Sequence, residues 1–155
     1  MPNLLVWTAV GLLGLSAALG PGTGQAQSQL QQLLEQGALQ MQRQQFDEAI
    51  ATFQKALKEE PQSAVTYNLL GMTYRLKYNQ VRNQELKRQE IEAFKKAVEI
   101  DPTYWVALIN LGATYYYQGD KANAAPLFKK ALTLNPNHPE RAQFEKMMRE
   151  GGERP

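Results

Sequence analysis

Cysteine and histidine, which commonly carry catalysis or bind metals, are nearly absent from this chain of 155 residues. There is no cysteine, which excludes a cysteine nucleophile, a disulfide and an iron–sulfur cluster. The single histidine, His138, cannot form a metal site built from several imidazoles. It lies between Asn137 and Pro139, so we expect it to serve in a turn or a helix cap.

The paired acidic residues do not form a catalytic pair of carboxylates. Asp47 and Glu48 are adjacent, and adjacent residues of a helix point in different directions. They are placed to stabilise a helix N-terminus through its dipole. The glycine-rich Gly20–Gly24 lacks the Lys and Ser/Thr that follow in a phosphate-binding loop. We therefore predict that the protein is not an enzyme and has no cofactor or metal.

A recurring frame of small and aromatic residues organises the chain. It is repeated at identical offsets in two stretches: Gly37, Ala49, Phe53, Ala56 and Pro61, and Gly112, Ala124, Phe128, Ala131 and Pro136. A longer version runs from Gly71 through Phe94 and Ala97 to Pro102. Internal repeats of this kind indicate an array whose units bury their apolar faces against one another.

The pattern within a unit predicts two antiparallel helices. In the first unit, apolar residues recur at steps of three and four from about Ser28 to Gln42, and again from Phe46 to Glu59. Gly37 is small where the two helices would cross, and Phe53 is expected to fill space toward the next unit. Pro61 ends the second helix because it lacks the amide donor.

These motifs resemble the tetratricopeptide repeat family. The third unit reads Leu108, Leu111-Gly112, Tyr115, Ala124, Phe128, Ala131 and Pro136, and the second reads Tyr67, Leu70-Gly71, Tyr74, Phe94, Ala97 and Pro102. The first unit departs from the family pattern, with Gln36 before the glycine and Gln40 in place of Tyr. The resemblance implies an all-α fold, an α-solenoid of three helical hairpins whose first helices line a concave groove.

The expected domain spans 28–150, with repeats at about 30–63, 64–104 and 105–138. Pro139 can open a helix, and a capping helix is expected at about 139–149, as repeat arrays require. The tail 151–155 should fray.

The second unit holds seven surplus residues near Leu76 to Leu86. Either each helix extends by about one turn, or an irregular loop forms. The segment is rich in charge: Arg75, Lys77, Arg82, Lys87 and Arg88 against Glu85 and Glu90. It is either a solvated protrusion or a knob that docks on a partner or an anionic surface.

Residues 1–27 differ in composition from the rest of the chain. The stretch 4–19 is apolar or small and carries no charge, but it is shorter than the roughly 20 residues that span a bilayer. Gly24 and Ala26 are small at the two positions that a signal peptidase reads. A signal peptide cut after Ala26 and an uncleaved membrane anchor both remain open. The repeats would be exported to a periplasm, lumen or extracellular space, or anchored by the N-terminus.

The resemblance places the candidate partner-binding residues on the groove side of the first helices. They are Leu34, Ala38, Met41, Asn68, Met72, Arg75, Ile109, Ala113, Tyr116 and, at the rim, Tyr117. Tyr and Arg anchor many interfaces, and Met adapts to varied partners. A clamp for a C-terminal carboxylate is not expected, because only Asn110 fits it, whereas Leu34, Ala38, Leu69 and Val106 occupy its other places.

The leading hypothesis is a scaffold that binds a partner peptide or helix and helps to assemble or stabilise a membrane or envelope complex. An apolar N-terminal segment followed by three repeats is similar to photosystem assembly factors of cyanobacteria and plastids. The alternative is a structural or self-associating subunit of a membrane-associated complex. The formal net charge of +2 implies no bulk field for nucleic acid.

Overall fold

The computed structural model describes the backbone of residues 24–153 and the side chains of residues 29–153. The apolar stretch 4–19 lies outside the described residues. The described part forms seven helices and contains no strand: α1 (Gly24–Gln42), α2 (Phe46–Glu59), α3 (Ala64–Val81), α4 (Gln84–Ile100), α5 (Trp105–Tyr117), α6 (Lys121–Leu134) and α7 (Arg141–Glu150).

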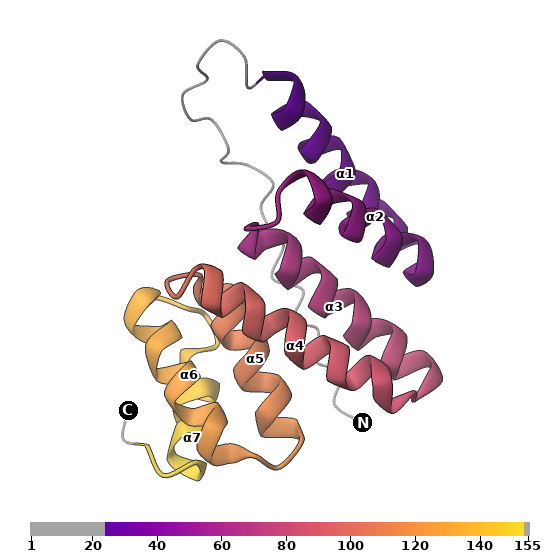
Figure 1. Ribbon diagram of the computed structural model, residues 1–155. Coiled ribbons are helices and arrows are strands. Elements are labelled where there is room, and N and C mark those ends of the chain that lie inside the picture. Colours follow the sequence, from indigo (N-terminus) through magenta and orange to yellow (C-terminus); the bar gives the residue numbers. More distant parts are fainter. Residues whose placement is uncertain (1–23, 154–155) are drawn as a thin grey trace.

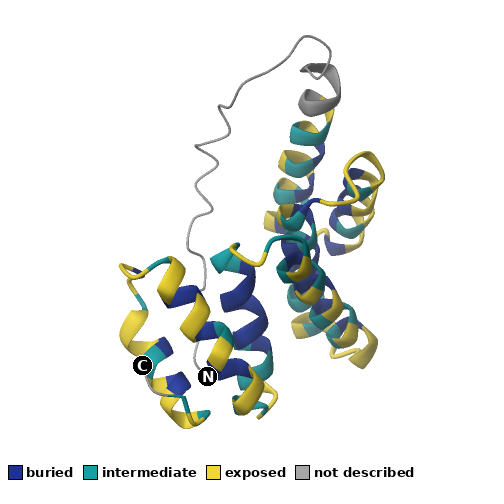
Figure 2. Ribbon diagram, turned by 60° about the vertical axis from the view of Figure 1, so that its left-hand side comes forward, coloured by how far each residue is buried: buried dark blue, intermediate teal, exposed yellow. Residues whose placement is uncertain are grey.

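The helices form three hairpins that stack in chain order. Figure 1 shows α1–α2 at one end, α3–α4 in the middle and α5–α6 at the other end, with α7 packed on α6. The second helix of each hairpin contacts the first helix of the next. Dark blue residues face these junctions in Figure 2, so the core runs along the stack. The all-α solenoid predicted from the repeat is confirmed for the described residues.

A glycine and a phenylalanine close each hairpin. A Cβ atom added to Gly71 would lie 2.7 Å from the Phe94 ring, and one added to Gly112 would lie 3.0 Å from the Phe128 ring. The Phe53 ring occupies the same place over Gly37. The ring therefore fills the space left by the missing side chain within its own hairpin, whereas the sequence suggested only a contact with the next unit.

The first hairpin carries a polar face where the other two have buried residues. Gln32, Gln36 and Leu39 are exposed on α1, whereas the matching positions are buried in α3 (Thr66, Leu70 and Thr73) and in α5 (Ala107, Leu111 and Thr114). Those positions contact the preceding hairpin, and no hairpin precedes α1 among the described residues. Gln36 departs from the family pattern for this reason, and Gln40 accepts a hydrogen bond of 2.8 Å from the Thr52 hydroxyl.

The surplus residues of the second unit lengthen both of its helices. α3 ends ten residues beyond Gly71, whereas α1 and α5 end five residues beyond Gly37 and Gly112. Arg82 turns the chain in the left-handed region, with φ of 57°. The Asn83 side chain then caps α4 by accepting a hydrogen bond of 2.9 Å from the Glu85 amide. The longer helices, not an irregular loop, are the alternative observed.

The C-terminal helix covers the end of the third hairpin. Phe144 of α7 stacks on Phe128, with ring centroids 5.1 Å apart. Buried His138 lies edge-on to Trp105, and its Nδ1 accepts a hydrogen bond of 3.1 Å from the Glu140 amide, which is the predicted turn role.

Residues 151–153 are ordered against α6, so the expected fraying of the tail is wrong for them. The Glu153 amide donates to the Met148 carbonyl at 3.0 Å, and the Glu153 carboxylate pairs with Lys129 at 2.9 Å. Gly151 is packed so closely on α6 that a Cβ atom there would collide with the Lys121 carbonyl. Residues 154–155 lie outside the description.

Candidate functional site

The first helix of each hairpin carries the residues predicted to bind a partner. Tyr117 is 55% exposed at the C-terminal end of α5. Six others are half-buried: Leu34, Ala38, Met72, Arg75, Ala113 and Tyr116. Asn68, Ile109 and Met41 are buried. The ten residues therefore do not form one continuous accessible set.

Asn68 and Ile109 are corrections to the predicted site. Asn68 is fully buried, and its side-chain oxygen accepts a hydrogen bond of 2.9 Å from the Asn110 amide across the α3–α5 junction. Burial raises the pKa of nearby Tyr104, whereas Asn68 acts to lower it. Ile109 is 4% exposed within the core of the third hairpin. Both side chains hold the array together and offer no surface to a partner.

Arg75 is a second correction, because its guanidinium is used inside the protein. Its Nε donates to Glu90 Oε1 at 2.8 Å. Its Nη2 donates to the Asn110 carbonyl at 2.8 Å and to the Thr114 hydroxyl at 2.7 Å. The guanidinium carbon also lies 4.8 Å from the centre of the Phe94 ring. Arg75 thus joins α3 to α4 and α5, and it does not present a free cation for a partner carboxylate.

Glu90 lies at the centre of this cluster and is fully buried. Besides Arg75, it binds Lys87 through Oε2 at 2.6 Å, and the Thr114 hydroxyl lies 2.7 Å from Oε1. A buried carboxylate is tolerated only when cations and hydrogen bonds satisfy it. We call Arg75, Lys87, Glu90, Asn110 and Thr114 the Glu90 cluster. It fixes the second hairpin against the third.

The charges of the lengthened second hairpin are largely paired within the protein. Lys77 pairs with Asp47 of α2, and Arg88 pairs with Glu85 on α4. Arg82 lies over the Tyr78 ring, with its guanidinium carbon 5.6 Å from the ring centre. These pairings favour a solvated protrusion over a knob that docks through its charge.

Tyr116 is tied to the end of α7. Its hydroxyl donates to Glu150 Oε2 at 2.6 Å, and Lys121 binds the same oxygen at 2.7 Å. These two partners, Lys121 first, lower the pKa of Glu150, while the bond to Glu150 raises the pKa of Tyr116. The Tyr117 ring stands edge-on to Tyr116 at 5.4 Å. Burial and the Glu140 charge raise the pKa of Tyr117, whereas Arg75 lowers it.

Two stripes on α3 and α5 remain accessible. Val65, which is 40% exposed, shares one stripe of α3 with half-buried Met72, because residues seven apart lie on one side of a helix. Ala113 and Tyr117 are four apart on α5. We call the two stripes together, Val65, Met72, Ala113 and Tyr117, the concave stripe. Val65 was missed, although its position three residues before Asn68 could have revealed it.

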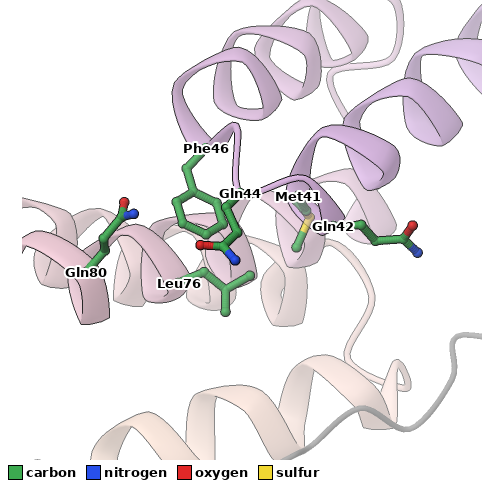
Figure 3. Close-up of a pocket in the computed structure, with 6 residues that line it drawn as sticks. All are labelled: Met41, Gln42, Gln44, Phe46, Leu76 and Gln80. Atoms are coloured by element: carbon green, nitrogen blue, oxygen red, sulfur yellow. The ribbon is translucent and has the colours of Figure 1, made fainter.

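A hollow of about 390 Å³ lies at the junction of the first two hairpins. It is lined by Met41, Gln42, Gln44, Phe46, Leu76 and Gln80, which come from α1, the following turn, α2 and α3; in Figure 3 Gln42 and Gln80 lie at opposite sides of the group. Of these, only Met41 belongs to the predicted set. We call it the glutamine-rimmed pocket.

Within 24–153, no group of three or more His, Cys, Asp or Glu side chains is placed to hold a metal ion. Over the same range, every helix is too short or too polar to cross a bilayer.

The stacked hairpins and the accessible first helices define an α-solenoid repeat protein. Comparison with protein families identifies the repeat. The family Tetratricopeptide Repeats-Sensor matches residues 9–116, and the family Tetratricopeptide repeat matches residues 105–138. Because the first match covers more than half of the chain, this chain belongs to the tetratricopeptide repeat family.

Curated relatives share about a third of their aligned residues with the chain. Human "Antiviral innate immune response effector IFIT1" is 30% identical over 104 residues, covering 58% of this chain and 22% of the relative. Mouse "Protein O-mannosyl-transferase TMTC1" is 32% identical over 89 residues, covering 57% and 9%. Arabidopsis thaliana "Tetratricopeptide repeat domain-containing protein PYG7, chloroplastic" is 30% identical over 111 residues, covering 69% and 35%. The chain spans about a third or less of the length of these relatives.

Solved structures share the fold at lower identity. The first tetratricopeptide domain of Spaghetti (RPAP3), bound to the HSP90 peptide SRMEEVD, has a TM-score of 0.66 at 19% identity and covers 79% of this chain and 93% of its own. PcrH in complex with the chaperone binding region of PopD has a TM-score of 0.66 at 19% identity, with coverage of 81% and 92%. The Yersinia enterocolitica chaperone SycD has a TM-score of 0.68 at 15% identity, with coverage of 88% and 94%.

Proposed function

We propose that this chain is a non-catalytic interaction scaffold that binds a peptide or helix of a partner protein on its concave face. The observation that carries the proposal is the concave stripe, where Val65 and Tyr117 expose apolar and aromatic surface on neighbouring first helices. Tyrosine and methionine supply contact area that adapts to a partner. Two similar folds, RPAP3 and PcrH, are described in complex with a peptide or a binding region of another protein.

The N-terminal segment supports a role at a membrane or in an envelope. The uncharged stretch 4–19 must bury its apolar surface somewhere, and the outward side of α1 offers it Gln32 and Gln36. Insertion into a bilayer, or removal as a signal peptide near Ala26, avoids that mismatch. We therefore favour a module that assembles or stabilises a membrane or envelope complex, with photosystem assembly as one form of this role. The name of one relative places it in chloroplasts.

N-terminal sequencing of the native protein separates the two fates of this segment. A chain that begins at Gln27 has been exported and released, whereas one that begins at Met1 or Pro2 keeps its anchor. Because α1 starts at Gly24, a cut after Ala26 would remove less than one turn of that helix.

Self-association is the second candidate function, and Leu39 favours it. This side chain is 45% exposed at a position whose counterparts, Thr73 and Thr114, are buried against a preceding hairpin. A second copy could cover it and form a structural subunit. Sedimentation analysis of residues 24–155 distinguishes the candidates, because the scaffold is expected to remain monomeric and the structural subunit to form constitutive oligomers.

Site-specific crosslinking tests the concave stripe. A photoreactive phenylalanine replaces Tyr117 in the full chain in its native host, and Val81, which is 53% exposed on the lengthened α3, carries the same group as a control. We expect one defined adduct at residue 117 that a Met72→Glu substitution abolishes. Equal labelling from both positions, or an adduct that survives Met72→Glu, would refute binding at the concave stripe.

A further inference from the structure

The glutamine-rimmed pocket owes its depth to the unequal lengths of the first helices. α1 ends at Gln42, while α3 runs on to Val81 and overhangs the turn that follows α1. Leu76 matches the last residue of α1, and Gln80 lies four residues further, on the overhang; the two side chains form one wall of the pocket. The Lys77–Asp47 ion pair holds the same part of α3 to the start of α2. The surplus residues of the second hairpin therefore add Gln80 to a wall that in a repeat of ordinary length would end at the position of Leu76.

Gln44 lies on the rim of the pocket in a backbone conformation that is unfavourable for glutamine. Its φ is 60°, in the left-handed region where glycine is preferred. The matching turn of the third hairpin has Gly119 there, with φ of 87°. Both turns close through the same bonds, Gln45 N–H to the Gln40 carbonyl at 2.9 Å and Asp120 N–H to the Tyr115 carbonyl at 2.9 Å. The first hairpin thus retains a glutamine at a cost in backbone strain, and its side chain lines the pocket.

The lining specifies an uncharged ligand with both apolar and amide character. Met41, Phe46 and Leu76 provide an apolar surface, and Gln42, Gln44 and Gln80 provide carboxamides, each of which both donates and accepts hydrogen bonds. No charged side chain belongs to this lining. A free peptide backbone offers the complementary N–H and C=O groups, whereas the backbone of a helix has already used its own. The volume lies within the range of about 300–1,000 Å³ typical of small-ligand sites.

From these observations we infer that the glutamine-rimmed pocket binds an extended, uncharged peptide segment of the partner through one large apolar side chain, with Gln42, Gln44 and Gln80 holding the flanking peptide groups. The inference rests on the proposed function and adds to it a second contact, separate from the concave stripe. Partner choice would then depend on an apolar residue in an uncharged context.

The smallest test ligand is a capped amino acid that offers one side chain and two peptide groups. N-acetyl-leucine N-methylamide is titrated into ¹⁵N- and methyl-labelled full chain, with N-acetyl-aspartate N-methylamide as the charged comparison. For a ligand of this size we expect a dissociation constant of about 1 mM. The side-chain amide signals of Gln42, Gln44 and Gln80 and the Met41 methyl signal should shift with the leucine compound, and the aspartate compound should bind at least about tenfold more weakly.

Gln44→Gly is the decisive variant because it should not impair folding. Glycine relieves the strain at φ of 60°, so the thermal midpoint should stay the same or rise while affinity for the leucine compound falls several-fold. Arg82→Gly is the matched control. Arg82 also has a left-handed φ, of 57°, but it lies outside the pocket lining, so its replacement should leave binding unchanged.

Three results would overturn the inference. They are unchanged affinity in Gln44→Gly, equal binding of the aspartate compound, and shifts confined to the concave stripe or absent up to the solubility of the ligand. The same variant separates this inference from the proposed function. If Gln44→Gly weakens the adduct at residue 117, the pocket contributes to partner binding. If only Met72→Glu abolishes the adduct, the concave stripe binds without the pocket, and the inference that the pocket contacts the partner is refuted.

Discussion

Removing the charge of buried Glu90 should destabilise the protein far more than removing the charge of an exposed glutamate would. Glu90→Gln keeps the size of the side chain but leaves Arg75 and Lys87 without their shared carboxylate. Breaking a buried ion pair by deleting one partner typically costs about 3–5 kcal/mol. The two cations retain side-chain exposures of 23% and 18%, so water can solvate them in part. We therefore expect a loss of about 2–3 kcal/mol in the free energy of unfolding.

A second variant tests the cause of that loss. In Arg75→Met/Glu90→Leu the pair is replaced by apolar side chains of similar size, which often leaves stability nearly unchanged when no buried charge remains. We expect the double variant to be more stable than Glu90→Gln, although Lys87 must then turn to solvent. The exposed Arg88–Glu85 pair provides the control, because Arg88→Ala should change the free energy by no more than about 0.5 kcal/mol.

Urea denaturation of residues 24–155, followed by far-ultraviolet circular dichroism, measures these differences. A Glu90→Gln loss below about 1 kcal/mol would refute the reasoning, since it would mean that the cluster contributes no more than a surface pair. A double variant less stable than Glu90→Gln would show that the ion pair itself, and not the avoidance of an unpaired charge, stabilises the junction of the second and third hairpins.

Three further outcomes follow from the packing, the polar face and the C-terminal contacts. Gly71→Ala should cost about 1–3 kcal/mol in thermal unfolding, because its Cβ would lie 2.7 Å from the Phe94 ring; an unchanged melting temperature would contradict the close contact. Gln32→Leu/Gln36→Leu should create an apolar face on α1 and cause concentration-dependent association in sedimentation experiments, and a variant that stays monomeric would weaken our account of that face. The carboxyl carbon of Glu150 should titrate below the ordinary glutamate pKa because of Lys121 and Tyr116, and Tyr116→Phe should move that pKa upward. The folded-state pKa is lowered, so the stabilisation is present above the unfolded value and is lost as pH falls through the folded one; an unmoved titration would exclude the Tyr116 bond.

The repeat frame was enough to predict the fold. The spacing of Gly71, Phe94 and Ala97 predicts a hairpin whose helices cross at the glycine, and the structure places the Phe94 ring on Gly71. Local spacing carries this information because each hairpin is built from residues close together in the chain. Even the weak first unit follows the rule, since Gln36 is polar where no described hairpin covers it.

The candidate site was less predictable because the hydrogen-bond partners that bury its polar side chains are distant in the sequence. Arg75 carries a charge on the groove side of α3, and its sequence neighbours give no sign of a partner. Its acceptors lie 15, 35 and 39 residues away, on α4 and α5. The glutamine-rimmed pocket was missed for a similar reason, because it depends on how far α3 extends beyond α1 and on a left-handed glutamine.

Because Arg75 is bonded inside the protein, charge should play little part in partner binding at the concave stripe. With that guanidinium bonded to Glu90, the concave stripe of Val65, Met72, Ala113 and Tyr117 would offer a bound partner no formal charge of its own. Long-range attraction then contributes little to the rate of encounter, and added salt has little to screen. Affinity for a partner bound there should therefore change little between dilute buffer and the ionic strength of seawater.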